Sequence, residues 1–311
     1  MARKFAAVIM AAGKSTRMKS ALPKAAHMIR GKAMTRHVVD ACLAAGIDNI
    51  VVVVGHGADK VKAALGPDVS YAMQAEQLGT GHACQQAMPA ISDDVTDVVV
   101  LPGDAPLITS QALAGLIETH AAKANAATLL TAILDDAGAY GRVVRDSSGA
   151  VIGITEAKDA DQKILAIREI NASIYCFDKA DLIERLATLG TDNAQGEYYL
   201  TDVITMLADA GRPVGAVIAP DANDVVGINN RVELARAAAG MRGRILDELM
   251  LAGVTIVDPM TTYIDSGVII GPDTIIHPCT VIESGSRIGA NCEVGPFARL
   301  RGVTLADGTK E

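Results

Sequence analysis

The chain has 311 residues, of which half are apolar and only 3% are aromatic. A chain of this length can bury a large α/β domain with a smaller appendage, without a disulfide or a structural metal. The formal net charge of -8, with no long run of Lys or Arg, argues against nucleic-acid and anionic-membrane partners. Any positive charge that binds phosphate must therefore be local.

The cysteines and the N-terminus predict the compartment. Five widely spaced cysteines without a C-x-x-C pair indicate free, buried thiols in a reducing cytoplasm. Residues 3–12 imitate a secretory signal, but the apolar run is short and continues into polar and basic residues 13–17. No apolar stretch approaches the ~20 residues of a membrane span. We therefore expect a cytoplasmic protein without a membrane partner.

Strand-like and helix-like runs alternate from the N-terminus, which is typical of βαβ units on a mainly parallel sheet. The glycine-rich region 129–177 predicts a more antiparallel half that could close over a second substrate. The other expected elements are strands at 5–10, 50–54, 69–73 and 97–101, and helices at 33–45, 59–65, 81–88, 179–187 and 200–210. Because ligands bind at the carboxyl ends of strands in open α/β sheets, the loops that follow the strands are candidate binding segments.

The C-terminal part changes pattern. A long helix is expected over 231–252, with Leu234, Ala238, Ile245 and Leu249 as its apolar stripe. Apolar residues then recur every six positions, which predicts a left-handed parallel β-helix of little more than two coils, with these residues inside: Ile264, Ile270, Ile276, Ile282, Ile288, Val294 and Leu300. We expect a domain at 1–228, a linker helix at 229–252 and the short β-helix at 253–311.

The loop after the first strand carries the first chemical signal. It reads Met-Ala-Ala-Gly-Lys-Ser-Thr-Arg-Met over residues 10–18, and a Leu-Pro-Lys sequence ends at Lys24. Backbone N–H groups of such a turn can approach phosphate, while Arg17 and Lys24 can neutralise it. A Walker A loop would need glycine at Val8, and a dinucleotide fingerprint would need glycine at Ser15. The alternative is an ordinary surface turn with two solvated cations.

Two further loops end on the same edge of the expected sheet, at residues 74–83 and 101–107. With the later segments 139–142, 154–158, 169–171, 195–199 and 227–231, they resemble one family. The chain is similar to the N-terminal half of the bacterial bifunctional N-acetylglucosamine-1-phosphate uridylyltransferase and glucosamine-1-phosphate N-acetyltransferase. The resemblance runs from about Ala7 to Arg301, in order and at matching spacing.

The resemblance implies a Rossmann-like nucleotide-diphospho-sugar transferase domain with a mainly parallel sheet. It implies Mg²⁺-dependent transfer of UMP from UTP to N-acetylglucosamine 1-phosphate, giving UDP-N-acetylglucosamine and pyrophosphate for cell-envelope synthesis. The alternatives are a relative that uses another sugar 1-phosphate or another pyrimidine nucleotide, and a protein that binds sugar nucleotides without turnover.

The resemblance also implies residue roles. Asp104 and Asn229 match magnesium ligands, and hard oxygen donors suit that ion. Arg17 and Lys24 match the residues that hold the triphosphate and, with Asp104, are the expected catalytic residues. His82 lies among these segments and is expected to be structural. Gln74, Gly79 and Thr80 match uracil-reading residues, and Gly141, Glu156 and Asn171 match sugar contacts. The other expected substrate-binding residues are Met10, Ala11, Ala12, Gly13, Pro102 and Gly103.

Two departures qualify the match. Ser15 stands where the family usually has glycine, which restricts the backbone of the loop. The sequence ends at Glu311, before the acetyl-transfer residues of the family, of which only Arg301 has a counterpart. We therefore expect no acetyl transfer. We expect a homo-oligomer, a trimer, because complete family members pack three β-helices around a threefold axis.

Overall fold

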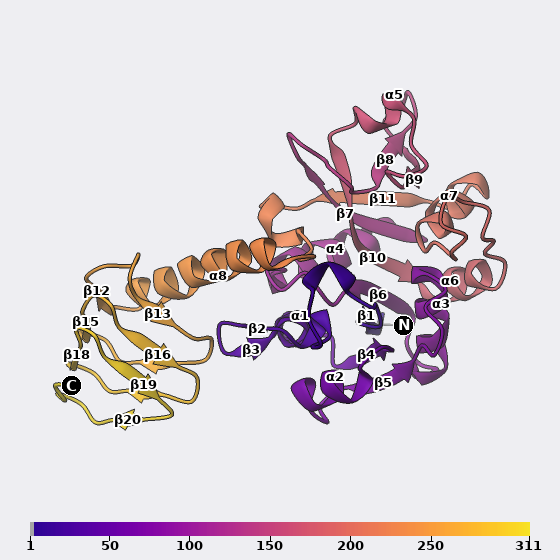
Figure 1. Cartoon of the computed structure of the whole chain (residues 1–311). Helices are drawn as coiled ribbons and strands as arrows, with labels where there is room; N and C mark the ends of the chain where they lie inside the picture. The colour runs from indigo at the N-terminus through magenta and orange to yellow at the C-terminus, as the bar shows by residue number, and fades with distance from the viewer. Residues whose placement is uncertain (1–2) are drawn as a thin grey trace. The chain divides into compact units, whose positions relative to one another are not determined.

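A computed structural model describes residues 3–311 (Figure 1). The chain forms two compact units, one made of residues up to 27 together with 34–229, the other of residues 28–33 together with 230–311. Within residues 3–311, no helix has the length and apolar character needed to cross a membrane.

The first unit is built on a nine-stranded sheet in the order β11-β7-β10-β6-β1-β4-β5, with a β8–β9 hairpin attached to β10. The four strands β6, β1, β4 and β5 are parallel, as predicted. The Ala- and Val-rich sequences of β1, β4 and β6 are buried on both faces of the sheet, which is what a parallel sheet covered by helices requires. These strands span Phe5–Met10 (β1), Asn49–Val54 (β4), Ser70–Met73 (β5) and Asp97–Pro102 (β6).

The other half of the sheet is mainly antiparallel, which confirms the prediction for 129–177. Strand β10 runs antiparallel to β6, β7 and β8, while β11 is parallel to β7. These strands span Ala127–Ile133 (β7), Arg142–Arg145 (β8), Val151–Thr155 (β9), Glu169–Asp178 (β10) and Val214–Ile218 (β11). Strand β11 was not among the expected elements.

Helices cover both faces of the sheet. One core cluster joins the sheet to α1, α2 and α4, and the other joins it to α3, α6 and α7. The helices span Met34–Ala44 (α1), Ala58–Leu65 (α2), Thr80–Ala87 (α3), Ser110–Lys123 (α4), Gln162–Leu165 (α5), Lys179–Leu186 (α6) and Thr201–Asp209 (α7). Helix α4 was not expected from the sequence. Short 3-10 turns lie at Thr16–Met18 (η1), Lys24–Ala26 (η2), Met88–Ala90 (η3) and Ala222–Val225 (η4).

The second unit contains α8 (Arg231–Leu251) and the predicted β-helix, whose short strands form three parallel sheets. Ile264 pairs with Ile282, and Ile282 with Leu300, so equivalent positions lie eighteen residues apart. All seven predicted interior residues are at most 8% exposed, which confirms the six-residue pattern. The strands are Thr255–Ile256 (β12), Tyr263–Ile264 (β13), Ile269–Ile270 (β14), Ile275–Ile276 (β15), Val281–Glu283 (β16), Arg287–Ile288 (β17), Glu293–Val294 (β18), Arg299–Arg301 (β19) and Thr304–Leu305 (β20).

The predicted division into 1–228, 229–252 and 253–311 needs correction in two places. First, α8 is not a separate linker, because Leu246 and its neighbours pack into the core of the β-helix. The most buried residues of α8 are Ala237, Met241 and Leu246, which are not the stripe expected from the sequence.

Second, the early hairpin β2 (Met28–Ile29) and β3 (Lys32–Ala33) belongs to the β-helix unit. The N–H of Ser266 donates to the carbonyl of Arg30 at 3.1 Å. Gly31, with φ of +80°, has no room for a side chain, since an added Cβ would lie 1.9 Å from Oγ of Ser284. No local pattern in the hairpin could have revealed this distant packing.

Candidate active site

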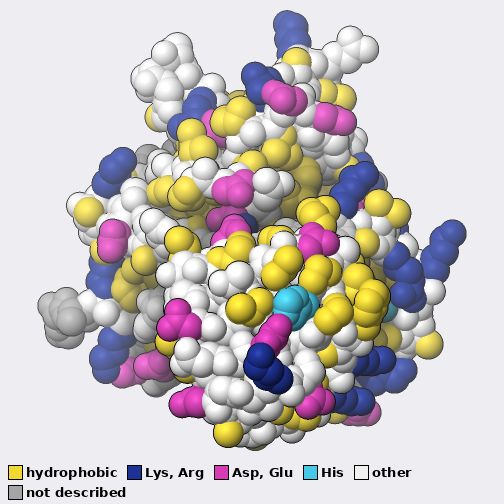
Figure 2. All heavy atoms as spheres, turned by 90° about the vertical axis from the view of Figure 1, so that its left-hand side faces the viewer, with side chains coloured by type: hydrophobic (Ala, Val, Ile, Leu, Met, Phe, Trp, Pro, Cys, Tyr) yellow, Lys and Arg dark blue, Asp and Glu magenta, His cyan; other side chains and the backbone are white. Residues whose placement is uncertain are grey.

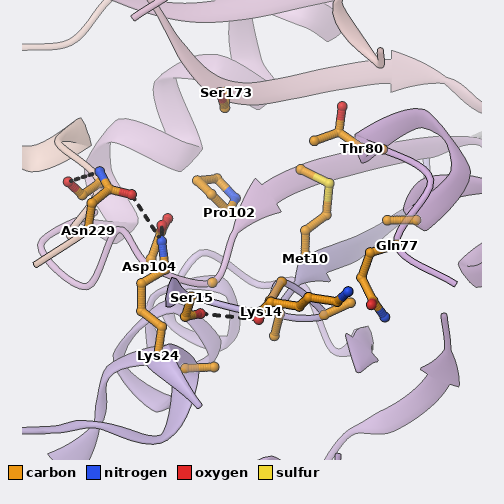
Figure 3. Close-up of a pocket in the computed structure, with 18 of the residues that line it drawn as sticks. Met10, Lys14, Ser15, Lys24, Gln77, Thr80, Pro102, Asp104, Ser173 and Asn229 are labelled. Atoms are coloured by element: carbon orange, nitrogen blue, oxygen red, sulfur yellow. Dashed lines mark hydrogen bonds and ion pairs between the residues drawn. The ribbon is translucent and has the colours of Figure 1, made fainter. Parts of the chain in front are cut away.

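A cavity of about 650 Å³ lies in the first unit and is lined by the loops that follow β1, β5 and β6. This size suits a ligand larger than a single phosphate group. Figure 3 shows two ends of the cavity: Lys24, Asp104 and Asn229 point toward one another at one end, and Thr80 and Gln77 lie at the other. The predicted convergence at the carboxyl ends of parallel strands is thus observed.

The charged end consists of four predicted residues. Lys24 forms an ion pair with Asp104, and its Nζ also donates to Oδ1 of Asn229 at 3.2 Å. The guanidinium of Arg17 donates to the same Oδ1 at 2.8 Å. Arg17 does not line the cavity itself but reaches this cluster through Asn229. Arg17 and Lys24 therefore meet Asp104 and Asn229, which lie far from them in sequence.

The backbone around Asp104 is held on both sides. The preceding residue, Gly103, packs so closely that an added Cβ would lie 2.9 Å from Oγ1 of Thr35, whose hydroxyl donates to the Gly103 carbonyl at 2.7 Å. The N–H of Ile228 donates to the carbonyl of Asp104 at 2.9 Å, which ties the β6 loop to the segment that carries Asn229. The two oxygen-bearing side chains are thus placed together by backbone contacts.

The side chains of Asp104 and Asn229 fit a magnesium ion. Their oxygens converge on one cation, the Lys24 ammonium, and a carboxylate with an amide oxygen is a hard-oxygen donor pair. Among residues 3–311, no group of three or more His, Cys, Asp or Glu side chains could hold a metal. A two-ligand site still suits Mg²⁺, which keeps several waters and binds substrate phosphates.

The opposite end of the cavity is formed where β5 leads into α3. Gln74 follows β5 and is 3% exposed, and its Nε2 donates to the carbonyl of Gly79 at 3.0 Å. Gly79 has φ of +117° and precedes Thr80, whose Oγ1 accepts from the N–H of Leu200 at 3.0 Å. These contacts hold the three residues predicted to read uracil side by side at the wall of the cavity.

Ser15, the departure from the usual glycine, adopts the left-handed conformation with φ of 55° and ψ of 39°. This conformation explains why glycine suits the position, since a side chain there costs about 1 kcal/mol or more. The Ser15 hydroxyl donates to the carbonyl of Gly13 at 3.1 Å, which offsets part of that cost. This hydrogen bond helps to hold Ser15 in the left-handed conformation.

The three predicted sugar contacts lie together at the ends of β8, β9 and β10. The N–H of Asn171 donates to the carbonyl of Gly141 at 2.9 Å, and an added Cβ on Gly141 would lie 3.4 Å from Oε1 of Glu156. None of the three lines the cavity, whose wall is formed here by Tyr140, Ala172 and Ser173. Their role as sugar contacts stays a prediction.

Asn171 has a structural function that the sequence did not reveal. Its Nδ2 donates to the hydroxyl of Tyr175 at 2.7 Å, and its Oδ1 accepts from the N–H of Ser173 at 3.0 Å. The register of β10 against β7 shifts between Asn171 and Ile174. Asn171 therefore holds a β-bulge that turns Ser173 toward the cavity, and bulges often place residues next to active sites.

Glu156 is half-buried in an acidic region. Burial raises the pKa of the Glu156 carboxyl, and the nearby charges of Asp159 and Asp202 add to that increase. The hydroxyl of Thr201 donates to Oε1 of Glu156 at 3.4 Å, which opposes the shift only partly. A half-buried carboxylate whose pKa is raised by burial is a candidate for function, because groups with shifted pKa values concentrate at functional sites.

All other predicted substrate-binding residues line the cavity, from Met10 to Gly13 and at positions 24, 74, 79, 80, 102, 103, 104 and 229. Several lining residues had no predicted role: Lys14, Ser15, Gln77, Tyr140, Ser173 and Glu197. Lys14, Ser15 and Gln77 lie inside the loops singled out from the sequence, so their position in those loops was a usable signal. Tyr140 and Glu197 lie in the segments 139–142 and 195–199 that carried the resemblance, whereas Ser173 had no signal, because local sequence does not show that a bulge turns it toward the cavity.

Comparison with known proteins agrees with this geometry. A MobA-like NTP transferase domain matches residues 7–137, and the bacterial transferase hexapeptide, with six repeats, matches residues 267–302. A bifunctional protein GlmU of Brevibacillus brevis is 48% identical over 305 residues, covering 98% of this chain and 66% of that protein. Another of an Exiguobacterium species is 47% identical over 301 residues, covering 97% and 67%. One of Streptomyces avermitilis is 46% identical over 313 residues, covering 99% and 65%.

The fold and the site thus define an α/β NTP-transferase domain followed by a hexapeptide-repeat β-helix. The chain belongs to the family of GlmU bifunctional proteins, as the resemblance predicted. It spans about two thirds of the length of the curated relatives it matches.

Proposed function

We propose that the chain transfers UMP from UTP to N-acetylglucosamine 1-phosphate, releasing pyrophosphate and forming UDP-N-acetylglucosamine for cell-envelope synthesis. The observation that carries the proposal is the convergence of Arg17, Lys24, Asp104 and Asn229 at one end of a cavity of about 650 Å³. A protein that only binds a sugar nucleotide does not need cations and hard oxygen donors gathered at one point. Similarity to bifunctional GlmU proteins over nearly the whole chain supports the same activity.

The reaction requires no catalytic base from the protein. A sugar 1-phosphate is largely dianionic at neutral pH, because the second pKa of a phosphate monoester is near ~6. Its oxygen attacks the α-phosphorus of UTP in line. The bond between the α-phosphorus and the oxygen that bridges it to the β-phosphorus then breaks, and pyrophosphate leaves with that oxygen. The protein supplies alignment and charge neutralisation. Lys24 and Arg17 perform the second task at the charged end.

Asp104 and Asn229 are the proposed ligands of Mg²⁺, which when bound neutralises phosphate charge. The Lys24 ammonium contacts an oxygen of each of these two side chains. Lys24 would neutralise phosphate charge beside the ion that Asp104 and Asn229 would hold. Arg17 stays within reach of the same site through Oδ1 of Asn229.

In this proposal, the end of the cavity that binds uracil and the wall that receives the sugar determine which substrates are accepted. Gln74, Gly79 and Thr80 read the base, while Gly141, Glu156 and Asn171 lie beside the wall that receives the sugar. Buried polar groups reject a ligand that leaves them unpaired, so N-acetylglucosamine 1-phosphate should be preferred over glucose 1-phosphate. Pyrophosphate release with UTP and Mg²⁺ against a panel of sugar 1-phosphates tests this. Equal kcat/KM for the two sugars would favour a different sugar substrate, and no release with any sugar would contradict the activity.

A trimer is part of the same proposal. Hydrophobic side chains stand among charged ones on the surface that Figure 2 shows. In the β-helix unit, Val257, Met260, Ile269 and Phe297 are each at least half exposed, which leaves apolar area for a neighbouring copy. Light scattering on the purified chain should give the mass of a trimer. A monomer at micromolar concentration would contradict this assignment.

Cytoplasmic location is proposed because UTP is the substrate and four of the five cysteines are buried free thiols. The expectation that these 311 residues do not transfer acetyl groups stays a prediction. Incubation with acetyl-CoA and glucosamine 1-phosphate tests it, and measurable N-acetylglucosamine 1-phosphate would contradict it.

A further inference from the structure

His82 on α3 was expected to be structural, but it lies in direct contact with the residue proposed to read the base. Its Nδ1 is 3.1 Å from Nε2 of Gln74, and the same Nε2 donates to the carbonyl of Gly79 at 3.0 Å. A carbonyl oxygen only accepts, so the Gly79 contact identifies the amide nitrogen of Gln74 and rules out the rotated amide. The contact with His82 must then be a second donation from that nitrogen.

The protein therefore uses both hydrogens of the Gln74 amide. Nδ1 of a neutral imidazole accepts one of them only when the ring proton is on Nε2. Nε2 of His82 lies 3.3 Å from the side-chain amide of Gln86, which is exposed and free to turn its oxygen toward that proton. Oε1 of Gln74 accepts no hydrogen bond from residues 3–311, although the side chain is 3% exposed and lines the cavity. Gln74 thus presents an acceptor, and no donor, to the base.

We propose that His82 is a positioning residue that makes Gln74 an acceptor for the base and so selects uracil over cytosine. The inference rests on the proposed role of Gln74 in reading the base. Uracil carries a hydrogen on N3 and matches an acceptor. Cytosine has a lone pair on N3 and would face the Oε1 of Gln74. To donate to cytosine, the amide would have to rotate, which would leave the Gly79 carbonyl facing an oxygen and would present Oε1 to Nδ1 of His82.

The surroundings of His82 limit how far the imidazole can adapt. The ring lies 6.4 Å from the ring of Tyr198, whose backbone accepts from Gly81 N–H and donates to the Leu78 carbonyl, each at 2.8 Å. Gly79 packs closely against Tyr198, since an added Cβ on Gly79 would lie 2.5 Å from the Tyr198 carbonyl oxygen. The acceptor at Gly79 and the acceptor at His82 are therefore held at a fixed spacing around the Gln74 nitrogen.

The test is the affinity of the full chain for UTP, dTTP and CTP, measured by titration calorimetry with Mg²⁺ and without sugar phosphate. Three variants are compared: His82→Leu, which removes the acceptor; His82→Asn, whose Oδ1 can take the place of Nδ1; and Lys123→Ala, an exposed residue on α4 that does not line the cavity, as control. We expect wild type to bind CTP more weakly than UTP, and His82→Leu to reduce the ratio of the two Kd values about tenfold, the effect of one neutral hydrogen bond.

dTTP separates this role from a merely structural one, because thymine carries the same N3 hydrogen as uracil. The Kd ratio of dTTP to UTP should stay constant in His82→Leu, and His82→Asn should restore the CTP ratio of wild type. Equal loss of affinity for all three nucleotides would overturn the proposal. So would a ratio of the CTP and UTP Kd values that His82→Leu leaves unchanged, or a ratio near one in wild type. The binding measurement stands apart from turnover, so absence of pyrophosphate release would contradict the proposed activity and not this reading of the base.

Discussion

Replacing Gly79 by alanine should damage both stability and nucleotide binding. Gly79 has φ of +117° and ψ of 175°, a backbone region that is almost confined to glycine and costs other residues about 1–3 kcal/mol. An added Cβ would also lie 2.5 Å from the carbonyl oxygen and 2.8 Å from the nitrogen of Tyr198. These are backbone atoms, so relief requires the chain to move.

The movement has a further cost. The Tyr198 carbonyl accepts from the N–H of Gly81, and the Tyr198 N–H donates to the Leu78 carbonyl, both at 2.8 Å. Weakening these two hydrogen bonds costs about 1 kcal/mol each. With the backbone strain, the free energy of unfolding should fall by about 3–5 kcal/mol. Because Thr80 and the start of α3 form the wall of the cavity, the affinity for UTP should fall as well.

Gly46→Ala is the matched control. Gly46 also has a positive φ, +81°, but no atom lies within 4 Å of an added Cβ, so only the backbone term of about 1–2 kcal/mol applies. Urea unfolding gives the two free energies, and calorimetric titration with UTP gives the two affinities. If Gly79→Ala and Gly46→Ala lose equal stability and bind UTP equally well, the argument from the Tyr198 contact is wrong.

Three further predictions test the charged end, the sugar side and the β-helix. Asp104→Asn keeps the shape but removes the charge, so pyrophosphate release should fall by about 10²–10³ with an unchanged circular dichroism spectrum; near-wild-type turnover would refute the metal assignment. Burial raises the pKa of Glu156 above its ordinary value of 4.5, so the ionised carboxylate destabilises the fold as pH rises through the raised value. Glu156→Gln should therefore have a higher Tm than wild type at pH 7 but not near pH 4. The same variant should lose sugar specificity. An equal gap in Tm at both pH values would contradict that pKa shift. Ile276→Ala should lower the free energy of unfolding by about 2–5 kcal/mol, because this side chain is buried inside the β-helix. Ile275→Ala, on the outward side of the same strand, should change it by less than about 1 kcal/mol. Similar losses in the two variants would refute the alternation of inward and outward side chains.

The parts of the fold that could be predicted are those with local signals. Continuous Ala and Val runs identified the parallel strands because both faces of such strands are buried. The six-residue period identified the β-helix because each interior position repeats once per side of the coil. Helix α4 was missed, and the expected stripe of α8 was only partly right, because Ala-rich helices have little contrast between their faces. Ile245 and Leu249 of that stripe pack against the β-helix core, but the most buried residues of α8 lie beside them.

The charged end of the site was also predictable. Parallel strands end at one edge of a sheet, so the loops after β1 and β6 had to approach each other, and the resemblance supplied the residue roles. The positions of Asn171 and His82 were not predictable. Asn171 proved to hold a bulge, which depends on Tyr175 and on the shift of β10 against β7. His82 proved to contact Gln74, which depends on the angle at which α3 leaves Gly79.

The sequence by itself determined the α/β class, the β-helix and the loops that carry the site, because each follows from a period or a spacing along the chain. Tertiary structure alone decided that residues 28–33 belong with the β-helix, since Gly31 and Ser284 are more than two hundred residues apart. It also decided which atom of Gln74 faces the cavity. An amide presents a donor or an acceptor according to its neighbours, and those neighbours, Gly79 and His82, are brought to it by the fold.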